Sequence, residues 1–303
     1  MLQQNETLFD KKDTKIIITV KPKKITFIDL FAGIGGFHCA FASLDAKCSF
    51  VCEIDSNAKK TYMANFKIDE NIFASDITKI ASENIPNHDI LCAGFPCQPF
   101  SQAGFKKGFE DTRGTLFFDI ARIIKSKQPK AFFLENVAHL LKHDNGNTFN
   151  IIKQTLLDLG YSFYYKIIKA SDFGLPQNRA RLFMVGFKND KLQNFEFPKP
   201  IPLKLTMSDI FGGNCDKKIG YTLRVGGRGS KITDRRNWDS YSVDGKIVRI
   251  EVNEAKKMQG LPDDFVFPVS STQAMKQLGN SVAIPVIKAV GEKILSYIQL
   301  NES

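Results

Sequence analysis

Short apolar runs alternate with longer amphipathic segments along residues 25–187. Between the runs, apolar residues such as Leu116, Ile120 and Ile124 recur at a spacing that predicts helices. The predicted strands are 25–30, 50–54, 89–93, 131–134, 163–168 and 181–187, and the predicted helices are 36–44, 116–127 and 149–159. Strands that alternate with helices of this length indicate an α/β fold with a parallel, doubly wound sheet.

The alternation ends after residue 187. A proline-rich connector covers 195–202, and the segment 212–238 then has seven lysines and arginines against two aspartates. Its glycines and arginines suit close approach to a phosphate backbone or to base edges in a groove. A solvated basic loop explains the same composition equally well. Further on, a turn at 279–281 is expected to lead into a helix that reaches residue 298.

The composition of the 303 residues narrows the class of protein. A net charge of +10 favours a polyanionic partner, because lysine and arginine gain affinity from phosphate contacts. No run approaches the roughly 18 apolar residues of a membrane span, and the N-terminus lacks the pattern of a secretion signal, so we expect a cytoplasmic protein. The six cysteines form no CxxC pair, and His139 and His143 have no accompanying ligands, so no metal site is expected.

The first chemical motif is Asp29-Leu-Phe-Ala-Gly33-Ile-Gly35-Gly36-Phe37, where a predicted strand gives way to a helix. Glycines let backbone amides approach a ligand closely, and a helix N-terminus favours negative charge. The spacing differs from the Gly-x-Gly-x-x-Gly dinucleotide fingerprint, which argues against a nicotinamide-dependent dehydrogenase.

Glu53 lies at the end of the second predicted strand, 50–54, and Asp76 lies at the end of a possible third strand. Glu53 is placed to accept hydrogen bonds from ribose hydroxyls, and Asp76 could accept one from an adenine amino group. Either acid alone is more simply explained as a solvated loop residue. The glycine motif, Glu53 and Asp76 in this order predict an adenosyl-type cofactor.

Cys97 lies directly after Pro96, beyond the predicted strand 89–93. The carboxyl end of a strand is where open α/β sheets bind ligands, and a thiolate there can attack electron-poor carbon. A buried cysteine at a strand end would normally be only a small apolar filler. The polar, glycine-containing stretch 98–114 that follows favours the nucleophile, because it has the composition of a mobile lid.

Two further polar motifs flank predicted strands. Glu135, in Leu134-Glu-Asn-Val137, is a carboxyl group at a strand end and is expected to have a raised pKa, so it could deliver a proton near neutrality. Asn136 could instead cap a helix. Arg179 and Arg181 are two residues apart and therefore point the same way in an extended chain. They could hold a carbonyl oxygen or a phosphate, or be surface charge alone.

These motifs in this order resemble the C5-cytosine DNA methyltransferase family, specifically the bacterial restriction–modification enzymes of the HhaI type. The similarity covers about residues 25–294. It is carried by 29–37, by Pro96-Cys97-Gln98, by the segments 108–116, 135–137 and 177–181, and by Gln277-Leu-Gly-Asn-Ser-Val282. The resemblance implies an S-adenosylmethionine-dependent, Rossmann-like catalytic domain formed by 1–187 and 273–303, with 1–24 as an N-terminal extension. It also implies a small, mostly β target-recognition domain at 188–272.

By that resemblance the cofactor is S-adenosylmethionine, with no metal. The residues implied to bind it are Phe31, Gly33, Gly35, Glu53, Ile54, Asp76, Ile77, Pro96, Leu116, Asn280 and Val282.

The resemblance also implies a covalent mechanism on a cytosine flipped out of duplex DNA. The Cys97 thiolate would add to C6, Glu135 would protonate N3, and Arg181, assisted by Arg179, would hold the O2 side of the base or polarise the Cys97 region. C5 would then take the methyl group. The residues implied to contact DNA are Gln98, Ser101, Arg113, Arg224, Arg228, Lys231, Arg235 and Arg236.

The expected partners are double-stranded DNA and, without a stable complex, a restriction endonuclease that shares the target site. We expect a monomer. The tRNA-methylating branch of the same fold is the main alternative, and a catalytically silent nucleic-acid-binding protein is a second. The amino-methylating enzymes need an Asp/Asn/Ser-Pro-Pro-aromatic tetrapeptide, which the sequence lacks.

Overall fold

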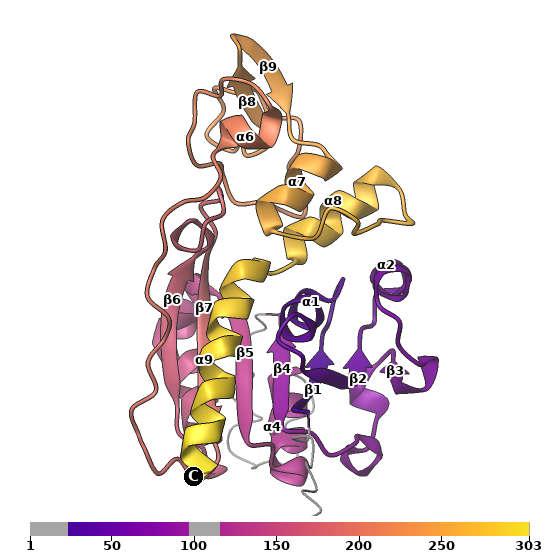
Figure 1. The fold of residues 1–303 in the computed structure, drawn as a ribbon, viewed down its shortest axis with the longest axis vertical. Coiled ribbons are helices and arrows are strands. Elements are labelled where there is room, and N and C mark those ends of the chain that lie inside the picture. The colour runs from indigo at the N-terminus through magenta and orange to yellow at the C-terminus, as the bar shows by residue number, and fades with distance from the viewer. Residues whose placement is uncertain (1–23, 97–115, 303) are drawn as a thin grey trace, which may run out of the picture.

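The computed structural model describes residues 24–96 and 116–302, which contain a seven-stranded sheet with helices on both faces (Figure 1). The strand order is β3-β2-β1-β4-β5-β7-β6. The strands are β1 (Thr26–Leu30), β2 (Lys47–Cys52), β3 (Phe73–Ala74), β4 (Ile90–Gly94), β5 (Ala131–Val137), β6 (Tyr164–Lys169) and β7 (Ala180–Phe187). The predicted doubly wound α/β sheet is confirmed.

One strand departs from the expected parallel arrangement. The strands β1 to β5 pair in parallel, whereas β7 pairs antiparallel with both β5 and β6. The connection from Lys169 to Ala180 holds only a short 3-10 helix, at Ala170–Asp172. A parallel pair needs a crossover of a dozen or more residues, so this shorter link returns the chain in the opposite direction.

The two faces of the sheet are covered by different helices. Alternate residues of β5 point to opposite faces, as the pleat requires. Ala131 and Phe133 belong to the same hydrophobic cluster as buried residues of α1 (Gly36–Ala42) and α9 (Ile284–Glu302). Phe132 and Leu134 belong to a second cluster, with α4 (Leu116–Lys127) and α5 (Asn147–Asp158). The helix α2 (Ser56–Asn65) packs through Tyr62 on the α1 side.

The segment after β7 begins with a long irregular stretch. Its regular elements are α6 (Met207–Phe211), the antiparallel pair β8 (Ser240–Val243) and β9 (Lys246–Arg249), and α7 (Val252–Gln259). Figure 1 shows α6, β8 and β9 together at one end of the long axis, with α7 and α8 (Ser271–Asn280) between them and the sheet. The expected turn at 279–281 is displaced, because Gly279 and Asn280 still belong to α8.

Short 3-10 helices complete the described part of the chain, at Glu70–Ile72, Ile77–Lys79, Ser82–Asn84 and Ala138–Gly146. Within that part, no helix is both long and apolar enough to cross a membrane.

Candidate functional site

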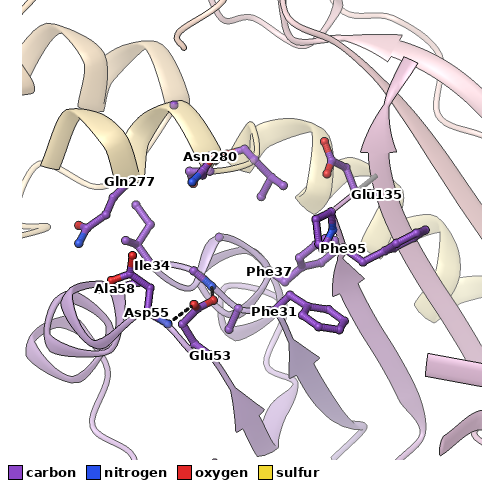
Figure 2. A pocket seen from close by; sticks show the side chains of 18 of the residues that line it. Phe31, Ile34, Phe37, Glu53, Asp55, Ala58, Phe95, Glu135, Gln277 and Asn280 are labelled. Atoms are coloured by element: carbon purple, nitrogen blue, oxygen red, sulfur yellow. Dashed lines mark hydrogen bonds between the residues drawn. The ribbon is translucent and has the colours of Figure 1, made fainter. Parts of the chain in front are cut away.

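A cavity of about 400 Å³ opens at the carboxyl ends of β1, β2, β4 and β5, beneath the end of α8. The loops that leave parallel strands converge on this edge, so polar groups from distant parts of the sequence meet there. Figure 2 shows Asn280 on one side of the cavity and Glu53 and Phe31 on the opposite side. The predicted residues that line it are Phe31, Gly33, Glu53, Ile54, Pro96, Leu116, Glu135, Arg179, Arg181, Asn280 and Val282.

Glu53 is held rigidly at the end of β2. Its Oε2 accepts a hydrogen bond from the Gly33 backbone N–H (2.8 Å), and its Oε1 accepts one from the Asp55 N–H (2.7 Å). Burial raises the pKa of Glu53, and these two N–H groups oppose the shift. Each carboxylate oxygen keeps acceptor capacity for a ligand hydroxyl. Gly33 has a φ of +55° and no atom within 4 Å of an added Cβ, so a ligand can approach its backbone.

The chemistry of this part of the cavity fits a nucleoside. Phe31, Ile34, Phe37 and Val282 supply apolar walls for a base, and Glu53 supplies an acceptor for a ribose diol. Ile34 and Phe37 were missed from the sequence, although both lie in the glycine motif. The cavity is also large enough for a ligand of nucleoside size.

Three predicted cofactor residues do not line the cavity. Gly35 lies against α2, where an added Cβ would be 2.3 Å from the Phe66 ring. Asp76 caps the 3-10 helix Ile77–Lys79 by accepting a hydrogen bond from the Thr78 N–H, and Ile77 is buried in the α4 side of the core. The preceding strand β3 has only two residues.

Glu135 and Arg181 form an ion pair inside the cavity. Glu135 Oε1 lies 3.0 Å from Arg181 Nε, and both side chains are largely buried. The expected strand 131–134 extends to Val137, because Glu135 pairs with Phe183 of β7 in the sheet. Burial raises the pKa of Glu135, opposed first by Arg181 and then by Arg179. A buried carboxyl with a raised pKa can hold a proton and donate it to a ligand.

Arg179 has a structural arrangement that the sequence did not reveal. Its guanidinium donates to three backbone carbonyl oxygens, those of Leu223 (3.2 Å), Gly279 (3.0 Å) and Ser281 (2.6 Å). Burial lowers the pKa of Arg179, as does the neighbouring Arg181, while Glu135 opposes both. Arg179 therefore lines the cavity and also joins α8 to the segment that begins at Leu223.

Asn136 is not a helix cap. It lies in β5, where its side-chain amide donates to the Phe95 carbonyl oxygen (2.9 Å) and its oxygen accepts from the Val137 N–H (2.8 Å). The helical segment that follows has Val137 as its N-cap residue, without a side-chain cap bond. Asn136 therefore fixes the chain two residues before Cys97.

Some predicted residues lie outside the described part of the chain. These are Cys97, Gln98, Ser101 and Arg113, as well as the expected lid and almost all of the N-terminal extension. Pro96 and Leu116 flank the gap, and both line the cavity. The chain thus enters and leaves the segment 97–115 at the cavity wall. Within the described residues, no group of three or more His, Cys, Asp or Glu side chains could hold a metal ion.

The predicted DNA-contacting residues after β7 differ in their surroundings. Arg224, Lys231 and Arg235 are exposed. Arg236 pairs with Asp234 at 2.8 Å, and Arg228 is folded back onto the protein.

Comparison with known proteins gives one consistent family. A model of C-5 cytosine-specific DNA methylases matches residues 25–234 and 222–296. The chain is 45% identical to Type II methyltransferase M.SsoII of Shigella sonnei, over 96% of this chain and 85% of that protein. It is 39% identical to Type II methyltransferase M.HhaI of Haemophilus parahaemolyticus, over 94% of this chain and 99% of that protein.

Solved structures agree at the level of the fold. A DNMT2 mutant from Spodoptera frugiperda has a TM-score of 0.70 at 19% identity, covering 91% of this chain and 100% of that chain. The Entamoeba histolytica methyltransferase EhMeth has a TM-score of 0.68 at 19% identity, covering 93% of this chain and 99% of that chain.

Proposed function

Because the chain belongs to the family of C-5 cytosine-specific DNA methylases, we propose that it methylates C5 of a cytosine flipped out of a short duplex DNA site. S-adenosylmethionine, when bound, supplies the methyl group as an electrophile on a sulfonium sulfur. Phe31, Gly33, Glu53 and Asn280 would hold it, since they line the cavity, whose apolar walls and Glu53 carboxylate suit a nucleoside.

One observation carries this proposal. Pro96 and Leu116, on either side of the segment that contains Cys97, line the same cavity as Glu53 and Glu135. A ligand held by Glu53 and a base held by Glu135 would therefore lie next to each other and next to the point where the cysteine segment begins. Methyl transfer through a covalent intermediate needs the methyl donor, the base and the cysteine close together.

Each of these residues has its own role in the reaction. The Cys97 thiolate adds to C6 of the cytosine, and Glu135 donates its proton to N3, so that no negative charge builds on the ring. C5 becomes an enamine carbon and takes the methyl group, so that the S–CH3 bond of the sulfonium breaks and S-adenosylhomocysteine is the product. A base, which could be water, then removes the C5 proton. Elimination of the Cys97 thiolate restores the C5–C6 double bond, and N3 returns its proton to Glu135. Arg181 orients Glu135 through their 3.0 Å ion pair and faces the O2 side of the base.

DNA recognition and methyl transfer are assigned to different parts of the chain. Residues 188–272 form the target-recognition domain, and 1–187 with 273–303 form the catalytic domain. The relatives are named Type II methyltransferases, which supports a role as the modification half of a restriction–modification system. We propose that the protein acts as a cytoplasmic monomer on each DNA strand separately, with a cognate endonuclease that shares its site.

The test uses transfer of a labelled methyl group from S-adenosylmethionine. Duplex DNA should be labelled by the wild-type chain and by Cys215→Ser, a matched thiol replacement far from the cavity, but not by Cys97→Ser. Activity retained in Cys97→Ser would contradict the covalent mechanism, and labelling of tRNA without duplex DNA would identify the tRNA-methylating branch. Bisulfite sequencing of DNA from cells that express the chain would identify the methylated cytosine.

A further inference from the structure

The residues 224–230, which we call the glycine loop, are held in one conformation by the part of the chain that follows them. Trp238 Nε1 donates to the Gly226 carbonyl oxygen (3.0 Å), and the Gly229 N–H donates to Asp239 Oδ2 (3.1 Å). Gly227 and Gly229 have positive φ, so the free loop would sample many backbone conformations. These two hydrogen bonds therefore restrict a segment that its sequence leaves flexible.

Arg228 supplies the third attachment. Its Nη2 donates to the Ile250 carbonyl oxygen (2.6 Å) and to Glu251 Oε1 (3.0 Å), and its Nε lies 3.6 Å from Asp239 Oδ2. The Asp239 side chain is 0% exposed, whereas that of Arg228 is 31% exposed. Two of the three guanidinium nitrogens, Nε and Nη2, are therefore directed at the protein.

The loop is also fixed relative to the cavity. An added Cβ on Gly279 of α8 would lie 2.5 Å from the Arg224 carbonyl carbon and 2.8 Å from the Val225 nitrogen. Arg179 holds the same two segments together through the carbonyl oxygens of Leu223 and Gly279. The first residues of the glycine loop thus pack directly on the helix whose end lines the cavity.

The outer surface of the loop is free to meet a ligand. Arg224 is exposed and Val225 is 49% exposed, and no hydrogen bond or ion pair connects the Arg224 side chain to the described residues. An arginine can donate two parallel hydrogen bonds to the major-groove edge of guanine. A loop that is already ordered loses less conformational entropy when it binds.

We propose that Arg228 does not contact DNA but is a positioning residue, which with Asp239 presets the glycine loop so that Arg224 reads a base pair next to the flipped cytosine. The inference rests on the proposed action on duplex DNA. It reverses the expectation that Arg228 binds guanine or phosphate. Arg224 and Arg228 are two arginines of the same loop, and they have different roles in this proposal.

The experiment measures the Kd of the full chain, with S-adenosylhomocysteine present, for a duplex with the methylation site and for duplexes with single base-pair changes near it. Each Kd is measured over a range of salt concentrations. The variants are Arg228→Gln, Asp239→Asn, their combination, and Arg224→Gln. Asp239 is informative because a side chain with no exposure cannot itself touch DNA.

We expect Arg228→Gln and Asp239→Asn each to reduce discrimination between the site and its altered forms by about tenfold, with no further loss in the double variant. The slope of log Kd against log salt should stay unchanged for both. Arg224→Gln should abolish discrimination at one base pair. A slope smaller by about 0.9 in Arg228→Gln would show a phosphate contact and overturn the proposal, as would unchanged discrimination in Asp239→Asn.

Two controls separate the possible failures. Binding of S-adenosylhomocysteine and the thermal midpoint report whether each variant is folded, and Arg228→Gln keeps the inference testable if Asp239→Asn is not folded. A wild-type chain that does not discriminate between duplexes contradicts the proposed function. Wild-type discrimination that Arg228→Gln leaves intact contradicts only the inference about the loop.

Discussion

The side-chain amide of Asn136 in β5 donates a 2.9 Å hydrogen bond to the carbonyl oxygen of Phe95, which follows β4. Both groups are buried, and Asn136 is next to Glu135 in sequence. Two consecutive residues of β5 therefore have different roles. Glu135 is the acid of the proposed reaction, and Asn136 fixes the chain just before the cysteine segment. A change in this hydrogen bond should act on the nucleophile without touching the cofactor side of the cavity.

Asn136→Ala should reduce kcat by about 10–100-fold, because a buried carbonyl oxygen left without a donor costs about 1–3 kcal/mol and the chain before Cys97 would shift to find one. The Kd for S-adenosylhomocysteine should change by less than about twofold. Single-turnover methyl transfer and calorimetric binding measure the two effects. Gln154→Ala, on the exposed face of α5, is the control, and an unchanged kcat in Asn136→Ala would show that the hydrogen bond does not position the nucleophile.

The proton on Glu135 should give the rate a pH dependence of defined sign. Burial raises the pKa of this carboxyl, so more of it is protonated near neutrality, and the protonated fraction falls as the pH rises. A decrease in kcat/KM on the alkaline side is therefore expected. Glu135→Gln should lower kcat by about 10²–10⁴-fold and remove that decrease, since an amide does not titrate. If the pH profile of Glu135→Gln kept the same alkaline decrease, that decrease would belong to another group.

At a pH high enough to ionise Glu135, Arg181→Met should destabilise the fold by about 3–5 kcal/mol, because it leaves the buried carboxylate without its nearest counter-charge. The double variant Arg181→Met/Glu135→Gln should recover part of this loss, since neither position of the pair then carries a charge. Urea unfolding of Arg181→Met, Glu135→Gln and the double variant measures the effect. Arg235→Met, at an exposed position, is the matched control. No recovery in the double variant would mean that Arg181 stabilises the protein by packing rather than by charge.

The sequence predicts the fold well where hydrophobic periodicity and strand order are sufficient. The helix 116–127 has the predicted bounds, and Glu53 follows its strand at the predicted edge. The direction of β7 is different, because periodicity reports which residues are buried but not which way a strand runs. The signal for its direction is the short connection 170–179, which is shorter than a parallel crossover needs.

The sequence also predicts only part of the site. Residue type and strand position predict that Glu53, Glu135 and Arg181 meet in one cavity. They do not predict that Arg179 bonds to three carbonyl oxygens or that Arg228 folds back on Asp239, because a charge pattern does not show which way a flexible side chain turns. The helix-cap alternative for Asn136 fails because its partner, Phe95, is distant in sequence and only the fold brings the two together.

Gly279→Ala should impair both DNA discrimination and stability. The added carbon would meet the backbone of Arg224 at 2.5 Å, and backbone cannot move aside as a flexible side chain can. We expect a loss of about 1–3 kcal/mol in unfolding free energy together with weaker discrimination between duplex sites. Gly226→Ala, where the added carbon meets open space, should leave the stability unchanged. Equal stability of the two variants would contradict the close contact between α8 and the glycine loop.

Asp29→Asn should make the protein more stable at neutral and alkaline pH. Burial raises the pKa of Asp29 well above its ordinary value, with the backbone of His38 opposing the shift and Glu53 adding to it. The folded state thus binds this proton more tightly than the unfolded state. The stability of the wild type should therefore fall as the pH rises from the ordinary carboxyl pKa through the raised one.

Asparagine does not titrate, so urea midpoints of Asp29→Asn should depend less on pH, whereas those of the exposed control Asp263→Asn should follow the wild type. Parallel pH curves for wild type and Asp29→Asn would show that this carboxyl is not protonated in the folded protein.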